Sequence, residues 1–181
     1  QVCPKPGRGG GATIDPAHCA DLADAGRTML GPAQEAWLAR AFAQSRSRWN
    51  LIAQQTLIAP LVIPGKDGRR LLRTDGWDGY PAARLRLLEA IEQTRLPGPV
   101  VIGGDLHAFH VADLHAGARD DGPVLAAEFV GTSIASQSAS QAHYDRLTAA
   151  NGHLHYANGT QRGYILAEVR RDRIDVDLMG L

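Results

Sequence analysis

The sequence has little lysine, few aromatic residues and no long apolar run, and each shortage excludes a class of protein. Its 181 residues include two lysines, Lys5 and Lys66, so arginine carries nearly all of the positive charge. The 19 basic and 19 acidic side chains cancel, which leaves no net field to attract nucleic acid or an anionic membrane. No apolar run approaches the roughly 20 residues that a membrane-spanning helix needs. We therefore expect neither a nucleic-acid-binding patch nor a membrane span.

Several catalytic motifs are missing as well. The sequence contains no Gly-x-Ser-x-Gly elbow, no Cys-x-x-Cys pair and no Gly-x-Gly-x-x-Gly loop. Serine hydrolases, zinc ribbons and dinucleotide-binding domains are thereby disfavoured.

Cysteine is scarce, and both copies lie near the beginning of the chain. Cys3 and Cys19 could close a loop of about 15 residues, which would stabilise the fold by about 3 kcal/mol. Two unrelated thiols, or one thiol acting as a metal ligand, are the alternatives. We expect the disulfide because the segment is otherwise too rich in glycine to hold a shape, and such a bridge indicates an oxidising compartment.

Residues 1–27 are expected to form an irregular leader, because prolines and the glycine run at residues 7–11 oppose regular elements. The chain begins at Gln1 without a methionine, which favours a processed product or a fragment. Residues 28–181 are expected to form one layered domain. Apolar spacing and turn residues predict helices over 32–45 and from Pro81 to about residue 96, strands over 49–55, 100–102 and 123–130, and a final hairpin over 163–169 and 173–178.

Residues 60–70 are expected to form a loop and residues 77–81 a turn, and the polar stretch 136–159 is expected to be irregular with one short helix. The histidine-rich segment before residue 123 is assigned no element. The order of helices and strands fits an α/β fold with a mixed sheet and antiparallel final strands.

The most informative segment is Val100-Val-Ile-Gly-Gly-Asp-Leu-His107. An apolar strand delivers Asp105 and His107 at its C-terminal end, where ligand-binding loops collect in open α/β sheets. A carboxylate and an imidazole two residues apart can ligate a metal through oxygen and nitrogen. The alternative is that Asp105 caps the next element and His107 packs in a polar turn.

Other candidates have an ordinary interpretation beside the functional one. Thr132 and Ser133 end a second strand and could contact phosphate oxygens, or could bond their own backbone. Trp77, Asp78 and Tyr80 could line a site, or Trp77 could anchor a turn in the core. His153 and His155 share the spacing of a chelating pair, but no apolar strand leads into them, so we expect surface residues.

Taken in order, these segments resemble the C-terminal region of the PhoD-like alkaline phosphatases, in the metallophosphoesterase superfamily. The matching stretches run from about residue 28 to the end of the chain. They are Thr28-Met-Leu-Gly-Pro-Ala-Gln34 with Trp37-Leu38, Ser47-Arg-Trp49 with Gln54-Gln55, Asp75-Gly-Trp-Asp-Gly-Tyr-Pro-Ala-Ala-Arg84, Val100-Val-Ile-Gly-Gly-Asp-Leu-His107, Glu128-Phe-Val-Gly-Thr-Ser-Ile134 and Arg162-Gly-Tyr164.

The resemblance implies the C-terminal half of a layered β-sandwich flanked by helices, and a secreted or periplasmic enzyme that hydrolyses phosphate monoesters and often diesters. It implies a metal centre of iron and calcium, to which Asp105 and His107 would contribute. The family's upstream motifs are not found here: a strand-end Asp, an Asp/Tyr pair, and an acidic-Asp-His segment followed by Asn. We therefore expect an N-terminal half, as a second polypeptide, to supply the remaining ligands.

Two other hypotheses remain open. The chain could be a catalytically inactive binding or structural module of the same fold, although such a module has no need of both Asp105 and His107. It could also be a free-standing metal-binding domain that uses His107, His110 and His115 as ligands.

Overall fold

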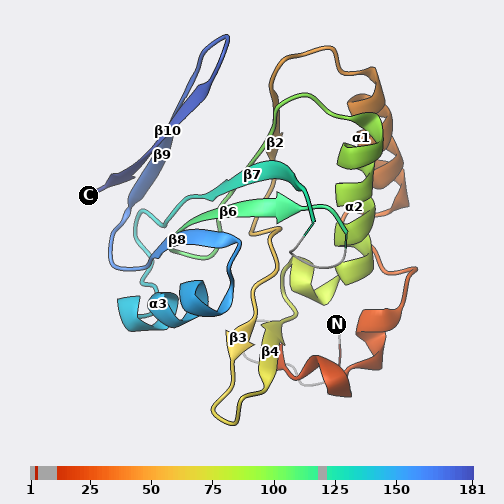
Figure 1. The fold of residues 1–181 in the computed structure, drawn as a ribbon. Coiled ribbons are helices and arrows are strands. Elements are labelled where there is room, and N and C mark those ends of the chain that lie inside the picture. Colours follow the sequence, from red (N-terminus) through yellow and green to blue (C-terminus); the bar gives the residue numbers. More distant parts are fainter. Residues whose placement is uncertain (1–2, 4–11, 118–121) are drawn as a thin grey trace.

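The structure is a computed structural model that describes residue 3, residues 12–117 and residues 122–181. Figure 1 shows a central sheet with two helices to one side of it and a separate hairpin to the other. The sheet has the strand order β2-β5-β7-β6-β8. Its bounds are β2 Asn50–Ala53, β5 Pro99–Gly103, β7 Val124–Val130, β6 Phe109–His115 and β8 Leu154–Asn158.

The central sheet is mixed. β2, β5 and β7 run parallel to one another, whereas β6 is antiparallel to both of its neighbours, β7 and β8. The three parallel strands therefore deliver the loops that follow them to one edge of the sheet. This arrangement confirms the predicted mixed α/β class.

The helices α1 (Pro32–Gln44) and α2 (Pro81–Thr94) both begin at a proline, as predicted, because proline tolerates the first turn of a helix. One face of α2 is buried, and its apolar residues recur at helical spacing: Ala83, Leu87, Leu88 and Ile91. α2 ends where Arg95 adopts a left-handed conformation. α1 packs on α2, so the two helices cover one face of the sheet together.

The two faces of the sheet differ in how well they are covered. Strand register places Val101, Glu128 and Ala112 together on the helix side, and all three are buried. The register places a second set on the opposite face: Leu51, Val111 and Tyr156, with Ile102 and Phe129. Leu51 is 47% exposed and Tyr156 is 40% exposed. We call this second set the open sheet face.

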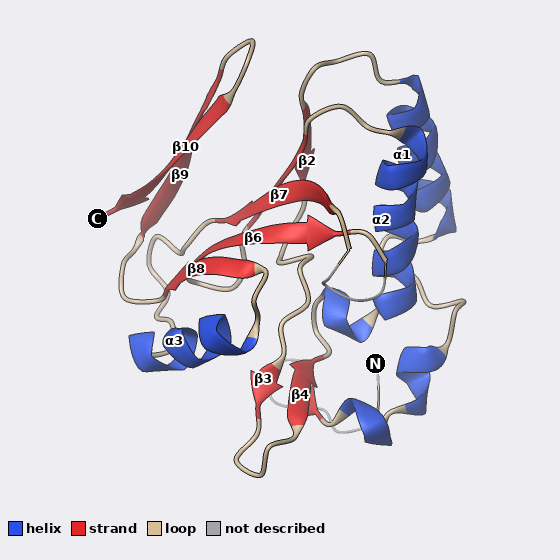
Figure 2. Ribbon diagram, in the orientation of Figure 1, coloured by secondary structure: helices blue, strands red, loops and turns tan. Residues whose placement is uncertain are grey.

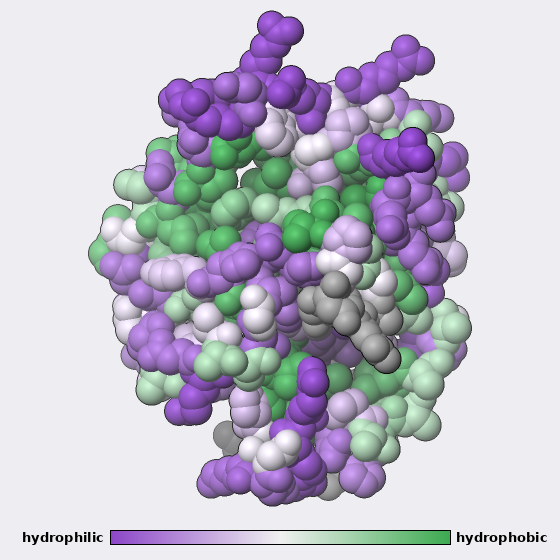
Figure 3. Space-filling model, viewed as in Figure 1, coloured by the Kyte–Doolittle hydropathy of each residue, from purple (hydrophilic) through white to green (hydrophobic). Residues whose placement is uncertain are grey.

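The hairpin of β9 (Gly163–Val169) and β10 (Ile174–Gly180) was predicted from its alternating pattern and is confirmed. It forms a two-stranded sheet of its own and stands beside the open sheet face rather than extending the central sheet (Figure 2). The indole nitrogen of Trp49 donates to the Arg170 carbonyl over 2.8 Å. Figure 3 shows hydrophobic side chains gathered in the upper left of the view, between this hairpin and the central sheet.

Two strands of the central sheet lie where the sequence predicted no strand. β6 occupies the histidine-rich segment after β5, and β8 occupies part of the polar stretch 136–159. The irregular structure predicted over 136–159 was wrong at β8, and β6 was missed. Polar residues hide the alternation of β6, yet pairing buries them: His110 is fully buried opposite Val130. The short helix predicted in the polar stretch is confirmed as α3, Gln141–Ala150, which packs beside β8.

The leader contains short regular elements, although the sequence predicted irregular structure. β1 (Thr13–Ile14) pairs with β4 (Arg70–Arg73), which pairs in turn with β3 (Ile63–Pro64). Two 3₁₀ turns, Pro16–His18 and Ala20–Ala23, follow β1. Prolines and glycines leave room for such one-turn elements, although they exclude longer ones.

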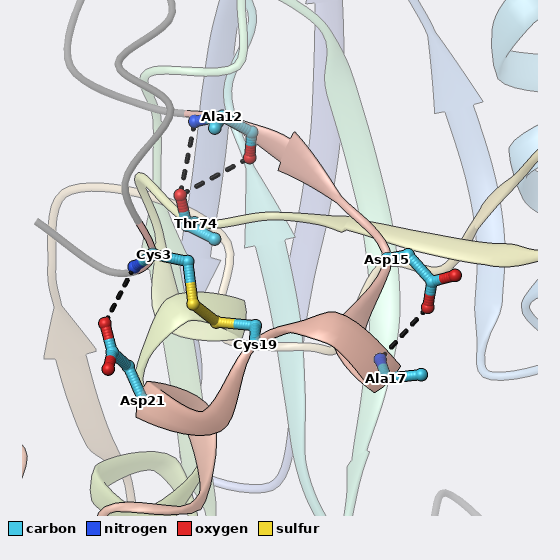
Figure 4. Close-up of a disulfide and its surroundings, with 7 residues drawn as sticks. All are labelled: Cys3, Ala12, Asp15, Ala17, Cys19, Asp21 and Thr74. Carbon is cyan, nitrogen blue, oxygen red and sulfur yellow. Dashed lines mark hydrogen bonds between the residues drawn. A yellow bond between two sulfur atoms is a disulfide. The ribbon is translucent and has the colours of Figure 1, made fainter.

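The predicted disulfide joins Cys3 to Cys19, with 5.8 Å between their Cα atoms. Figure 4 shows it beside the 3₁₀ turns, with the backbone amide of Cys3 donating to Asp21 over 2.9 Å. The glycine run at residues 7–11 lies outside the described residues. Within the described part of the chain, no helix combines the length and the apolar character that crossing a membrane requires.

Candidate functional site

The candidate site lies at the edge where the three parallel strands end. Backbone hydrogen bonds tie the three following loops together: Gly104 donates to the Gln55 carbonyl over 3.1 Å, and Gly131 donates to the Gly103 carbonyl over 3.0 Å. A side chain at Gly103 would meet the Thr56 carbonyl at 2.4 Å, so the close approach of the first two loops requires glycine there. Asp105 and His107 follow on the loop after β5.

Asp105 and His107 both adopt left-handed backbone conformations, with φ angles of 69° and 57°. Such angles are uncommon for residues other than glycine, and they cluster at functional sites where the surrounding fold holds them in place. Both side chains are exposed, and both line a cavity of about 330 Å³. The loop therefore presents the two predicted ligands outward from the sheet edge.

The ring of His107 is oriented by the backbone. Its Nδ1 lies 3.2 Å from the Gln137 carbonyl. If Nδ1 carries the proton and donates it to that carbonyl, Nε2 keeps its lone pair, which is the form that binds a metal ion.

Thr132 fixes the backbone of His107. Its hydroxyl lies 3.1 Å from the His107 carbonyl and 2.9 Å from the Gln161 carbonyl, so one proton serves both acceptors. Thr132 does not line the 330 Å³ cavity, and it acts on the loop through His107. Ser133 lies outside the cavity as well, and its hydroxyl donates to the Ser136 carbonyl over 2.6 Å.

The Trp77–Tyr80 turn contributes two of its three candidate residues to the cavity wall. Trp77 is buried, and its indole nitrogen donates to the Gln54 side chain over 3.1 Å. Asp78 lines the cavity too, but its carboxylate is engaged by Arg84 at 2.6 Å and by the Leu61 amide at 3.0 Å. Tyr80 lies outside the cavity lining, with the Arg27 guanidinium 4.9 Å above its ring.

Glu128 is a functional candidate that the sequence reasoning assigned no role. Its carboxylate is fully buried on β7 and accepts hydrogen bonds from the amides of Ile58 at 2.7 Å and Ala59 at 2.8 Å. Burial raises the pKa of Glu128 to about 7, against the opposing effect of these bonds. The carboxylate thus holds the loop after β2 against the sheet, and that loop forms part of the cavity wall. The sequence feature that could have indicated this role is a single charged residue within an apolar strand.

The seven histidines are divided among several parts of the molecule: His143 lines the 330 Å³ cavity with His107 and His110, and the other four do not. His110 is buried and lines the 330 Å³ cavity, whereas His115 lines a different cavity and its Nδ1 lies 2.7 Å from the Gly122 carbonyl. His155 is exposed, as expected. His153 is buried, with Nε2 2.7 Å from the Pro60 carbonyl, so its expected surface position was wrong. Tertiary contact with the loop at Pro60 explains the difference.

Asp105 and His107 are the two candidate metal ligands that the sequence predicted on this loop. Asp105 supplies an oxygen donor and His107 a nitrogen donor, which suit a mixed coordination shell. Across residues 12–117 and 122–181, together with Cys3, no group of three or more histidines, cysteines, aspartates or glutamates is placed to hold an ion. His107 and His110 line one cavity and His115 another, so the hypothesis of a free-standing centre on these three histidines is wrong.

Comparison with known proteins identifies the family. The family model described as PhoD-like phosphatase matches residues 8–178. This chain belongs to the PhoD-like phosphatase family. Alkaline phosphatase D of Bacillus subtilis (strain 168) is 36% identical over 147 residues, which are 79% of this chain and 25% of the relative. A solved structure of PhoD superposes with a TM-score of 0.73 at 35% identity and covers 81% of this chain.

The matches cover only part of each relative, which limits the conclusions that the comparison supports. The chain spans about a quarter of the length of the curated relative, and 28% of the solved PhoD chain. The family model and the curated relative are both described as phosphatases. Within this chain, the matched region includes the sheet edge at which Asp105 and His107 lie.

Proposed function

We propose that this chain is the C-terminal part of a metal-dependent phosphatase of the PhoD type, and that Asp105 and His107 are its contribution to the metal centre. The proposed substrates are phosphate monoesters, with diesters as a second class. The observation that carries the proposal is the pair of left-handed residues, Asp105 and His107, at the end of a parallel strand in a PhoD-like chain. Holding both residues in uncommon conformations costs free energy that a merely structural turn would not need to spend.

The proposed metals are iron and calcium. Asp105 would bind through its carboxylate oxygens and His107 through Nε2. When bound, such ions would polarise the phosphoryl oxygens and lower the pKa of the attacking water. The part of this chain is to place its two donors at the edge of the sheet, with the Thr132 hydroxyl and the Gln137 carbonyl fixing His107.

We propose that an N-terminal half, as a second polypeptide, supplies the remaining ligands. The open sheet face supports this part of the proposal. Sheets with parallel strands are normally covered on both faces. Here α1 and α2 cover one face, whereas on the other face, beside which the hairpin stands, Leu51 and Tyr156 remain 47% and 40% exposed. The relatives are about four times as long as the matched segment, which is ample chain to cover this face.

The Cys3–Cys19 disulfide supports a place outside the cytoplasm, in the periplasm or in the secreted fraction. Structural disulfides persist in oxidising compartments. The bridge pins the leader beside the 3₁₀ turns, and neither cysteine lines the candidate cavity, so its role would be stability rather than chemistry.

The deciding experiment is native mass spectrometry with metal analysis of the same sample. We expect a complex well above 19.4 kDa that carries iron and calcium. The variants D105N and H107A should each lose at least about tenfold in metal affinity, since loss of even an outer-shell partner costs that much. The complex should keep its mass in both variants, because neither side chain belongs to the open sheet face.

The matched controls apply the same chemical changes at exposed positions. Asp67, in the turn between β3 and β4, is replaced by Asn, and His18, in the leader, by Ala. Both controls should retain the wild-type metal content. A metal-free monomer would refute the enzyme proposal and favour the inactive module. Equal metal content in D105N, H107A and the controls would refute the assigned ligands.

A further inference from the structure

Arg73 lines the same cavity as Asp105 and His107, and the proposed metal centre gives it no role. It is the last residue of β4 and is followed by Thr74, which is buried. The Thr74 hydroxyl accepts a hydrogen bond from the Ala12 amide over 3.2 Å, so the chain is anchored directly beside Arg73. The β3–β4 hairpin therefore brings a cation into the wall of the candidate site from outside the loop after β5.

Asp75 holds the guanidinium of Arg73 along one side. Nε donates to Oδ1 of Asp75 over 3.1 Å, and Nη2 donates to Oδ2 of the same carboxylate. Two bonds to one carboxylate fix the plane of the guanidinium. The third nitrogen, Nη1, has no hydrogen-bond partner among the described residues. Because the Arg73 side chain is 58% exposed, a ligand in the open cavity can reach the edge formed by Nη1 and the second N–H of Nη2.

The charge of Asp105 acts on Arg73. The hydrogen bond to Asp75 raises the pKa of the Arg73 guanidinium, and the negative charges of Asp75 and Asp105 raise it further, against the opposing effect of burial. Asp78, another carboxylate in the same wall, is already paired with Arg84 at 2.6 Å. The free edge of Arg73 is thus placed to act on an anion that is bound beside Asp105.

A fixed guanidinium in the same cavity as the two proposed metal donors suits a phosphate ester. Resting on the proposed phosphatase function, we propose that Arg73 is a substrate-binding residue, whose free edge donates hydrogen bonds to the phosphoryl oxygens of the ester. The planar fork of arginine matches two oxygens of one phosphate and stays charged at alkaline pH. Phosphoryl transfer depends mainly on positioning and on neutralising the charge of these oxygens, and Arg73 supplies both.

The alternative is an exposed ion pair that binds no ligand, and the same hairpin contains a matched example. Arg69 and Asp67 are also two residues apart, and Nε of Arg69 donates to Asp67 over 2.6 Å. The Arg69 side chain is 59% exposed, nearly the same as Arg73, but it does not line the cavity. The variant R69Q is therefore the control for R73Q.

The experiment measures the binding of inorganic phosphate to the full 181-residue chain without metal, with chloride replaced at constant ionic strength. In a chain labelled with ¹⁵N-arginine, phosphate should shift the side-chain resonances of Arg73 to saturation and leave those of Arg69 unmoved. The dissociation constant from equilibrium dialysis should rise at least about tenfold in R73Q, since hydrogen bonds to charged groups contribute that much. It should not change in R69Q. R73K should recover part of the affinity, because lysine keeps the charge but lacks the fork.

The variant D105N tests whether the anion binds at the proposed site. In the metal-free chain, the Asp105 carboxylate repels a phosphate bound at Arg73. Removing this charge should therefore tighten phosphate binding by about twofold to fivefold, the range for exposed charges. The control D172N applies the same change at an exposed position in the turn between β9 and β10, and its affinity should equal that of wild type.

Equal phosphate binding in wild type, R69Q and R73Q would overturn the proposal, as would unmoved Arg73 resonances in both wild type and D105N. Weaker binding in R73Q without a gain in D105N would overturn it as well, because the anion would then lie away from the proposed metal ligands. If R73Q fails to fold, the Arg73 resonances of wild type and D105N decide alone. These measurements involve neither metal nor turnover, so this proposal can fail while the complex takes up metal, and the reverse.

Discussion

Replacement of Glu128 by glutamine tests whether this buried carboxyl group, which holds the loop after β2, has a raised pKa. In the folded chain, burial raises the pKa of Glu128 from its ordinary value of 4.5 to about 7. The folded state therefore binds a proton more tightly than the unfolded state does. Stability contributed by this proton is fully present below pH 4.5, declines as the pH rises, and is lost above pH 7.

The size of the effect follows from the shift. Each pKa unit corresponds to about 1.4 kcal/mol, so the difference between 4.5 and about 7 amounts to about 3 kcal/mol of unfolding free energy. Glutamine cannot titrate. The unfolding free energy of E128Q relative to wild type should therefore rise by about 3 kcal/mol between pH 4.5 and pH 7.5. At each pH the variant also carries a fixed cost of about 1–3 kcal/mol, because the amide can accept a bond from the amide of Ile58 or of Ala59 but not from both.

The assay is urea denaturation at a series of pH values, followed by tryptophan fluorescence. Other titrating groups are common to both proteins and cancel in the difference. The matched control is E92Q, the same change at an exposed position on α2, which should stay within about 0.5 kcal/mol of wild type. If the wild-type and E128Q curves run parallel across the range, the raised pKa is wrong. If wild type gains on E128Q as the pH rises, the two backbone amides outweigh burial.

Two further predictions concern the frame around the site. In G79A the new Cβ would lie 2.3 Å from the Thr74 carbonyl oxygen, so the unfolding free energy measured by urea denaturation should fall by about 2 kcal/mol. The control G152A, whose Cβ would meet nothing within 4 Å, should lose less than about 0.5 kcal/mol. Equal losses in the two variants would show that the turn after β4 relaxes freely. The double variant C3S/C19S should lose about 3 kcal/mol of unfolding free energy. Reduced wild type should melt at the same temperature as the variant under the same conditions. A variant as stable as oxidised wild type would show that the disulfide does not stabilise the fold.

The sequence predicted the half of the site that depends on local pattern. Val100-Val-Ile102 is apolar and ends in two glycines, so a strand and an abrupt stop follow from these residues alone, and the stop places Asp105 and His107 at the sheet edge. The prolines at residues 32 and 81 similarly mark the first turn of each long helix.

The rest depends on partners far away in the chain. Glu128 acquires its role from amides 69 and 70 residues earlier in the sequence. The strand β6 contains His110 and Asp113, which resemble loop residues until pairing with β7 and β8 buries the first of them. Because β8 has β6 as its partner in the sheet, missing one strand meant missing the other.

The left-handed backbone at Asp105 and His107 also limits which substitutions these positions can accept. Asparagine and aspartate tolerate this conformation better than other residues, and β-branched side chains are strongly disfavoured there. If the protein lost its catalytic role, the backbone conformation would still restrict which residues these two positions accept, in addition to any chemical requirement. Asparagine at residue 105 would keep the left-handed backbone but remove the charge. Valine would disfavour the backbone conformation and remove the charge as well. Comparing these two substitutions therefore separates loss of charge from loss of backbone shape.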